Sequence, residues 1–256
     1  MSAVVTGERV TSGEGGFNPT WQRHVAAYAC CEPHLPPGPV LDLGCGIGHS
    51  YELLAPRETV GLDLSAEALA GQDRETHVAD MRATPFPDGR FASVLSVHSL
   101  EHVPDPERVL DEVNRVLEPG GTAIFVTPNR LTFAKPDEII DPYHYIEYDP
   151  DQLAALCRPR FERVEILGIH GSPRYERIVA VEKRRLDQLL SRDPLRMRRL
   201  IPRSLRQRLY DRTLTRERRE PDPEAAAIVP EDFRLESEGQ ERALDLVAIC
   251  TAPAAP

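Results

Sequence analysis

The chain has 256 residues, of which 41% are hydrophobic and 28% are charged, and its net charge at pH 7 is -10. This length and composition predict a folded α/β domain with decorations and exclude a disordered or fibrous chain. The negative charge argues against a nucleic-acid partner, and no apolar run approaches the roughly 20 residues that a membrane-spanning helix needs.

The chain begins with residues 1–16, which are rich in Gly, Ser, Glu and Thr and are expected to be disordered. They contain no basic stretch followed by an apolar one, so no secretory signal is predicted. The cysteines are odd in number and suit neither a disulfide framework nor a zinc site: Cys30, Cys31, Cys45, Cys157 and Cys250. We therefore expect a protein of the reducing cytoplasm without a resident metal.

Helices and strands alternate along the first hundred residues. A helix is expected from Trp21 to Cys31, because Glu32-Pro33 ends it. Strands are expected at Val40–Leu43, Thr59–Leu64, His77–Ala79 and Phe91–Val97, with short helices at His49–Leu54 and from Ser65 to Leu69.

The alternation continues in the next part of the chain. Asp105-Pro106 is a typical helix start, and Pro119-Gly120-Gly121 is expected to end that helix before a strand at Thr122–Thr127. The buried face of the helix is predicted to be Val109, Leu110, Val113, Val116 and Leu117. Asp149-Pro150 begins another helix, with Gln152 placed for a capping box. Final strands are expected at Val164–Ile169 and Leu244–Cys250. This order predicts a Rossmann-like, doubly wound, mostly parallel sheet with helices on both faces.

A basic segment interrupts the acidic chain. Residues 174–219 hold 16 Lys or Arg and 6 Asp or Glu, so they carry an excess of +10 while the rest carries -20. We expect residues 17–173 to form the core, 174–241 a helical insertion broken at Pro194 and Pro202, and 242–256 the final strand and tail. The insertion is interpreted either as a solvated helical cap or as a surface that recruits an anionic acceptor or an anionic membrane.

A glycine-rich loop follows the first predicted strand. It reads Asp42-Leu-Gly44-Cys45-Gly46-Ile-Gly48, and its glycines allow sharp turns and close approach of a ligand. The dinucleotide fingerprint would require a third glycine at the position of His49. The loop therefore predicts a ligand site that is not a dinucleotide site, with Asp42, Gly44, Cys45, Gly46 and Gly48 as its candidate contacts.

Two further acids stand at strand ends. The spacing of Asp63 from the loop is typical of an acid that binds a ribose diol, and Asp80 could accept a hydrogen bond from the amine of adenine. Together with the loop, they indicate a nucleoside-type ligand that carries a carboxylate and no phosphate.

At these residues the chain resembles class I S-adenosylmethionine-dependent methyltransferases of type 11. The resemblance covers roughly residues 38–170 and includes the loop, Val60–Ser65, Asp80–Phe91, Val97–Asp105 and Leu117–Thr122. It implies S-adenosyl-L-methionine as the cofactor. It also implies that Gly44, Cys45 and Gly46 face its methionine part, Asp63 and Leu64 its ribose and adenine, Asp80 and Met81 its adenine, and Val97 and His98 its methyl group.

A base could accept the proton of a hydroxyl acceptor. One candidate is His144, in a stretch from Asp141 to Tyr148 that loosely resembles ubiquinone-pathway O-methyltransferases. His98 is its rival, His102 is interpreted as structural, and catalysis without a protein base stays open. Three tyrosines of this region are candidates for an acceptor pocket: Tyr143, Tyr145 and Tyr148.

The hypothesis favoured by the sequence is an enzyme that methylates a small or lipid-linked metabolite, most readily on oxygen. One alternative is a binding module that kept the fold and lost catalysis. The other, a nicotinamide-dependent dehydrogenase, is disfavoured by His49 in the loop.

Overall fold

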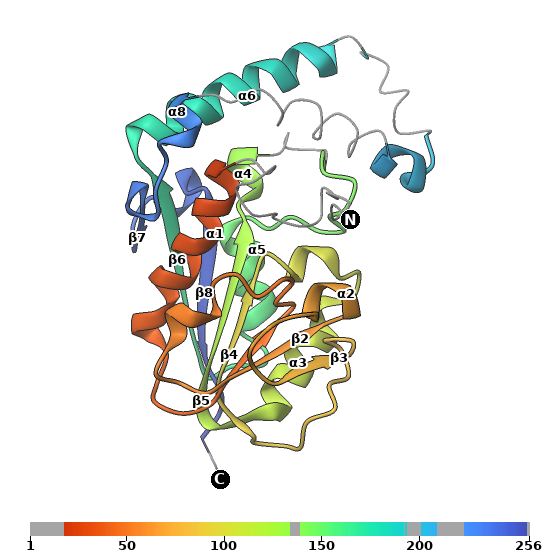
Figure 1. Ribbon diagram of the computed structural model, residues 1–256, viewed down its shortest axis with the longest axis vertical. Coiled ribbons are helices and arrows are strands. Elements are labelled where there is room, and N and C mark those ends of the chain that lie inside the picture. Colours follow the sequence, from red (N-terminus) through yellow and green to blue (C-terminus); the bar gives the residue numbers. More distant parts are fainter. Residues whose placement is uncertain (1–17, 134–138, 192, 194–200, 209–222, 255–256) are drawn as a thin grey trace.

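The computed structural model describes residues 18–133, 139–191, 193, 201–208 and 223–254 (Figure 1). The expectations for residues 1–16 and for Pro194 lie outside these ranges.

A single mixed sheet forms the centre of the described structure. Its order is β3-β2-β1-β4-β5-β8-β6-β7. The strands are β1 (Val40–Leu43), β2 (Thr59–Asp63), β3 (Thr76–Val78), β4 (Phe91–Val97), β5 (Leu117–Pro128), β6 (Arg163–Gly171), β7 (Phe233–Glu236) and β8 (Asp245–Thr251). Strands β1 to β5 are parallel, and β8 lies antiparallel between β5 and β6. The predicted Rossmann-like fold class is confirmed.

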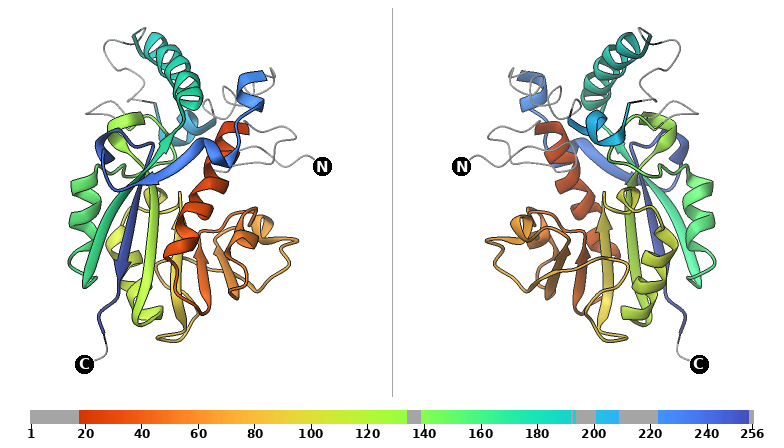
Figure 2. Two further views of the ribbon diagram at one scale, coloured as in Figure 1. Left: turned by 90° about the vertical axis from the view of Figure 1, so that its left-hand side faces the viewer. Right: turned by 90° about the vertical axis from the view of Figure 1, so that its right-hand side faces the viewer.

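Helices cover both faces of the sheet (Figure 2). The α-helices are α1 (Asn18–Cys31), α2 (Ala66–Leu69), α3 (Pro106–Val116), α4 (Arg130–Phe133), α5 (Pro150–Cys157), α6 (Pro173–Ser191) and α8 (Pro223–Ala226). Short 3-10 turns lie at η1 (Glu32–His34), η2 (Tyr51–Leu54), η3 (Leu100–His102), η5 (Pro230–Asp232) and η6 (Gln240–Arg242), and residues 203–208 are helical.

Each face of the sheet has its own apolar core. Helices α3 and α5 pack on one face, where Val113, Leu153 and Phe91 belong to one buried cluster. Helix α1 and the start of α6 pack on the other, where Ala27 and Tyr175 belong to the cluster. Four members of the predicted stripe, Val109, Leu110, Val113 and Val116, are buried in α3, because they recur at helical spacing towards the sheet. Leu117 is also buried, but it is the first residue of β5.

Capping residues set several helix starts. Ser65 accepts a hydrogen bond from the backbone N–H of Ala68, and Asp149 and Gln152 form the predicted capping box of α5. Asp105 occupies the N-cap of α3, but its carboxylate makes no capping bond and instead accepts from Arg82 at 2.7 Å.

Three local expectations differ from the structure. The helix expected from His49 is a 3-10 turn that begins at Tyr51, since the loop runs on through a left-handed Gly48. The turn expected at residues 119–121 lies inside β5. The pairing of β4 with β5 is irregular there, because Phe91 pairs with Leu117 and Ser93 pairs with Thr122. The insertion at 174–241 is not wholly helical, because it contains β7, an antiparallel edge strand on β6.

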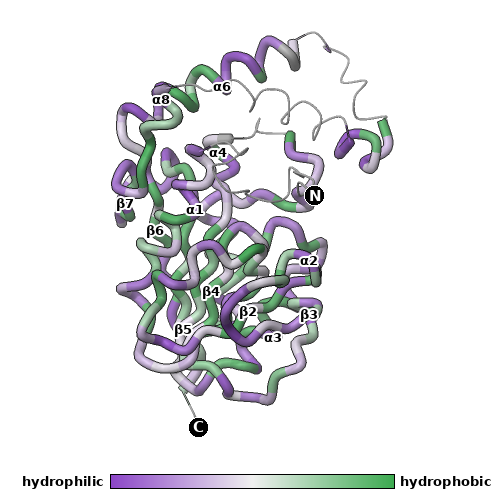
Figure 3. Tube along the Cα trace, viewed as in Figure 1, coloured by the Kyte–Doolittle hydropathy of each residue, from purple (hydrophilic) through white to green (hydrophobic). Residues whose placement is uncertain are grey.

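Helix α6 extends across the end of the molecule beyond β6, and the hydropathy of its residues alternates along it (Figure 3). Among the described residues, none of the helices combines the length and the apolar character that crossing a membrane requires.

Candidate functional site

A cleft opens at the carboxyl ends of β1, β2 and β4, the edge where ligands bind in open parallel sheets. Nine of the eleven residues predicted to contact a cofactor line it: Gly44, Cys45, Gly46, Asp63, Leu64, Asp80, Met81, Val97 and His98. The fold therefore brings together motifs that are up to 54 residues apart in the sequence.

Two loop glycines serve different purposes. At Gly44, with φ +77, an added Cβ would lie 2.6 Å from the Cβ of Ser99, so the loop packs tightly there. At Gly46, with φ +54, an added Cβ would meet nothing within 4 Å. Since Gly46 lines the cleft, that open space is where a ligand can approach the backbone.

The carboxylate of Asp63 is held by the backbone. Its Oδ2 accepts from the N–H of Gly46 at 2.9 Å, and its Oδ1 accepts from the N–H of Ser65 at 2.8 Å. A carboxylate offers about four acceptor positions, so both oxygens retain capacity for another donor. The side chain is thus oriented in advance to accept from two hydroxyls.

Asp80 is paired with Arg82, which the sequence did not single out. Arg82 donates to both oxygens of Asp80 and also to Asp105. The hydrogen bonds from Arg82 outweigh partial burial and lower the pKa of Asp80. Asp80 therefore stays ionised. The guanidinium of Arg82, which lines the cleft, already donates to both Asp80 and Asp105.

Apolar side chains stand around these acids. Leu64 is 71% exposed and Ile47 is 39% exposed, both in the cleft lining, while Met81 is buried behind them. Such exposure in a concave site is typical of a surface that a flat apolar ligand covers.

Asp42 lies beneath the loop, outside the cleft lining. It is fully buried, and its two oxygens accept from the Tyr28 hydroxyl at 2.8 Å and from Arg74 at 2.7 Å. Burial raises the pKa of Asp42, against the opposing effect of Arg74. Because its carboxylate is turned to these two partners, Asp42 is not among the residues that line the cleft, and its predicted contact with a ligand stays a prediction.

Gly48 also packs inward. A Cβ there would lie 2.2 Å from the side chain of Gln72. Gln72 in turn donates to the carbonyl of Gly46 at 2.8 Å and accepts from Arg74 at 2.9 Å. Gly48 is therefore needed for packing, and Gln72 and Arg74 support the loop from below.

A histidine cluster lies on the α1 side of the cleft. The rings of His24 and His98 have centroids 4.4 Å apart, and His49 lies 5.9 Å from His24. Burial lowers the pKa of His49 to about 4, and burial together with the two neighbouring rings lowers the pKa of His24. His24 and His49 are thus neutral near pH 7.

His98 faces a buried acid. Its Nε2 lies 3.1 Å from Oδ1 of Asp245, although the alignment does not meet hydrogen-bond geometry. Asp245 is fully buried and paired with Arg23 of α1, and the pKa of Asp245 is low because the attraction of Arg23 and His98 outweighs burial. His98 also adopts a φ of +50, unusual for a residue with a side chain.

His144 is not part of the cleft lining. Its Nδ1 lies 2.9 Å from Glu147 Oε1, and its ring lies beside Glu101 and His102. Burial lowers the pKa of His144, but the carboxylates of Glu147, Glu101 and Asp141 outweigh it and leave the pKa raised.

Of the three tyrosines suggested for an acceptor pocket, Tyr145 and Tyr148 line a second cavity together with Glu147. Tyr143 is not among its lining residues. The predicted acceptor role of these tyrosines stays a prediction.

Known proteins resemble this chain in sequence and in fold. A family model described as a methyltransferase domain matches residues 41–125. A "Probable S-adenosylmethionine-dependent methyltransferase" of Mycolicibacterium smegmatis is 32% identical over 178 residues, or 66% of this chain and 69% of that protein. The ubiquinone biosynthesis O-methyltransferase of Aromatoleum aromaticum is 30% identical over 52% of this chain and 68% of its own length.

Among solved structures, a SAM-dependent methyltransferase of Thermotoga maritima superposes with a TM-score of 0.61 at 16% identity, covering 92% of each chain, which shows the fold alone. Relatives named O-methyltransferases match at 30–37% identity and relatives named N-methyltransferases at 30–32%. The names of relatives therefore do not decide which atom is methylated.

Proposed function

We propose that this chain, which belongs to the S-adenosylmethionine-dependent methyltransferases, methylates an oxygen atom of a small or lipid-linked metabolite. When bound, S-adenosylmethionine supplies an activated methyl group on a positively charged sulfur. The protein has to hold that cofactor, align the acceptor and take up the acceptor's proton.

The cleft fits this cofactor. Its lining includes the carboxylates of Asp63 and Asp80, and the guanidinium of Arg82 is already engaged by Asp80 and Asp105. Such a lining suits hydroxyls, an amine and a positive charge, and it repels phosphate. In the proposed arrangement Asp63 accepts from the ribose hydroxyls, Asp80 accepts from the adenine amine, and Leu64 packs on the adenine ring.

The loop completes the cofactor seat. Gly46 leaves room for close approach, as its added Cβ would meet no protein atom within 4 Å. Cys45 is buried, and burial raises the pKa of its thiol to about 12, so the side chain is a neutral packing group. We assign no redox or nucleophilic role to it.

His98 is the proposed general base. It lines the cleft and turns Nε2 to Asp245, which leaves Nδ1 to accept the proton of an acceptor hydroxyl. Asp245 would orient the ring and stabilise its protonated form. His144, the other candidate, is favoured less because it does not line the cleft.

The observation that carries the proposal is the strained backbone of His98. A positive φ in a non-glycine residue costs free energy and persists where the surroundings enforce it. Here the strain turns the imidazole into the ligand cleft and against a buried acid, which suits an acid-base role better than a packing role.

The test measures S-adenosylhomocysteine formation with panels of hydroxyl and amine acceptors. His98→Gln should keep cofactor affinity and lower turnover on a hydroxyl acceptor by at least about tenfold. His34→Gln, at an exposed position of η1, is the control. Turnover confined to amines would contradict O-methylation. Unchanged turnover of the His98→Gln variant on a hydroxyl acceptor would show that His98 is not the base.

For the acceptor, we propose an anionic or membrane-presented molecule. Helix α6 exposes Arg177, Arg184 and Arg185 beside Glu176, Glu182 and Asp187, and it belongs to the segment that carries the basic excess. A basic segment in an otherwise acidic protein attracts anionic partners.

A further inference from the structure

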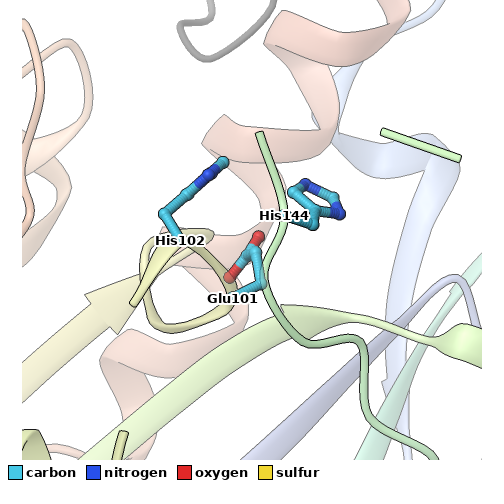
Figure 4. A group of neighbouring side chains, drawn as sticks. All are labelled: Glu101, His102 and His144. Atoms are coloured by element: carbon cyan, nitrogen blue, oxygen red, sulfur yellow. The ribbon is translucent and has the colours of Figure 1, made fainter. Parts of the chain in front are cut away.

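Glu101, His102 and His144 converge from two segments of the chain (Figure 4). The first two lie in η3 after β4, and His144 lies in the loop before α5. One potential ligand atom of each lies within 4.8 Å of the others. The backbone N–H of Tyr145 donates to the carbonyl of Glu101 at 2.8 Å, which fixes the two segments together.

Both imidazoles are oriented through Nδ1. His102 Nδ1 lies 3.2 Å from the carbonyl of Tyr143, and His144 Nδ1 lies 2.9 Å from the carboxylate of Glu147. Where Nδ1 donates to these acceptors, Nε2 of the neutral ring keeps its lone pair, and Nε2 of His144 also lies 3.9 Å from Oδ2 of Asp141. Protein histidines that bind metals are held by the same kind of outer hydrogen bond.

One oxygen of Glu101 is buried without a hydrogen-bond partner among the described residues. The residue is 1% exposed, and the oxygen concerned is Oε2. Within the same part of the chain, Oε2 of Glu147, which is 7% exposed, has no partner either. Two buried carboxylates with unused oxygens create a negative site, and a cation placed there would relieve the cost of burying them.

We propose that Glu101, His102 and His144 form a binding site for one divalent transition-metal ion. Two imidazole nitrogens and one carboxylate suit zinc, cobalt, manganese or iron, whereas magnesium and calcium prefer oxygen ligands. Three protein ligands leave positions open for water or an acceptor atom. Glu147 and the Tyr143 carbonyl hold the two rings.

The site adjoins the cofactor cleft, because His102 also lines that cleft. In an extension that rests on the proposed function, the ion binds the acceptor oxygen and favours loss of its proton. The O–H bond breaks and its proton passes to His98; an O–CH3 bond forms, and the C–S bond breaks with its electron pair left on sulfur. The ion keeps its charge throughout.

The segment beyond α6 supports the same loop. Arg203 donates to the carbonyls of Pro142 and Tyr143 at 2.7 and 2.8 Å, and its guanidinium lies 3.6 Å from the centre of the Tyr145 ring. The Tyr143 carbonyl therefore accepts from both Arg203 and His102. This arrangement keeps His144 and His102 in place while the ion exchanges.

The test uses the full chain without an affinity tag, stripped with a chelator and then titrated with Co²⁺ alone or Zn²⁺ alone. We expect one ion per chain by elemental analysis, with visible Co²⁺ absorption. Glu101→Gln, which keeps shape and removes charge, and His144→Ala should each weaken binding by at least about tenfold. His77→Ala is the matched control, because His77 Nε2 also faces a carboxylate, Glu75 at 2.7 Å, outside the cluster.

Cofactor affinity of each variant, measured by calorimetry, shows that it is folded. Less than a tenth of an equivalent of ion on the wild type, or equal affinity in Glu101→Gln and His144→Ala, overturns the site. If the ion binds as expected but chelation leaves methyl transfer unchanged, the catalytic extension is overturned. Because ion binding is measured without an acceptor, failure of the site and failure of the proposed O-methylation are distinguished.

Discussion

Side chains around the cleft are held by partners before any ligand arrives. Asp63 is fixed by two backbone N–H groups and Asp80 by Arg82, and Nε2 of His98 lies 3.1 Å from Asp245. Preorganised polar groups lose little freedom when a ligand binds. The site therefore has the character of a preformed binding cleft.

His49 should make the protein acid-labile. Burial lowers its pKa from 6.5 to about 4, so between these values the unfolded chain binds the proton and the folded one does not. Its contribution to stability is thus complete above pH 6.5 and is lost as the pH falls towards 4. The expected size is up to about 3 kcal/mol.

The measurement is thermal unfolding of wild type and His49→Gln at pH 7.5 and 4.5. The groups that face His49 are Trp21, Tyr28 and His24, and His24 adds acid lability in both proteins. The variant should lose less stability on acidification than the wild type. An equal loss in both proteins would show that His49 is not buried as a neutral ring.

Candidate ligand-binding residues could be predicted from the sequence where they stand at the end of a strand. Asp63 and Asp80 were identified because each comes directly after an alternating apolar segment. Gln72 and Asp245 could not be, since the Gly46 carbonyl and Arg23 that they bond lie 26 and 222 residues away and no local pattern marks them. The convergence of His144 with Glu101 was missed for the same reason.

The glycine loop is the element on which the cleft depends. It continues from β1 beside the end of β2, where the N–H groups of Gly44 and Cys45 donate to the carbonyl of Leu62 at 2.8 and 3.0 Å. The motif itself predicted this turn. The element that follows was expected to be a helix from His49, yet it is a short 3-10 turn, because the left-handed Gly48 delays the helical conformation.

Gly46→Val should abolish cofactor binding while the protein still folds. A β-branched side chain resists the φ of +54, and it would project into space that no protein atom fills. Calorimetry with S-adenosylmethionine and far-UV circular dichroism together check this expectation. Gly71→Val is the control, because Gly71 also has a positive φ with open space around it but does not line the cleft. Wild-type affinity in Gly46→Val would place the ligand elsewhere.

At the scale of the molecule, strand and helix order was predictable because the strands are apolar and the helix starts are marked by Asp-Pro. Strand β7 was not predicted, because Phe233–Glu236 is short, half polar and defined by its pairing with β6. The uneven charge was visible in the sequence, but the partner that it attracts was not.

The basic segment should bind anionic membranes. Vesicles containing anionic lipid should retain the wild type at low salt, and neutral vesicles should not. Replacing Arg177, Arg184 and Arg185 together by Gln should weaken binding by about 1 kcal/mol per charge. The same change at Arg158, Arg163 and Arg234, exposed elsewhere, should have little effect. Co-sedimentation measures the vesicle binding of all three proteins. Equal binding by the three would contradict the membrane proposal.

The central claim is that the cleft at Asp63 binds S-adenosylmethionine. Isothermal calorimetry of the full chain with that cofactor and, separately, with NAD tests it most directly. The account predicts one site for S-adenosylmethionine, none for NAD, and a loss of about 1.5–3 kcal/mol in Asp63→Ala. Asp111→Ala, an exposed acid paired with Arg160, should bind as the wild type does. Binding of NAD in place of S-adenosylmethionine, or an unchanged affinity in folded Asp63→Ala, would contradict it.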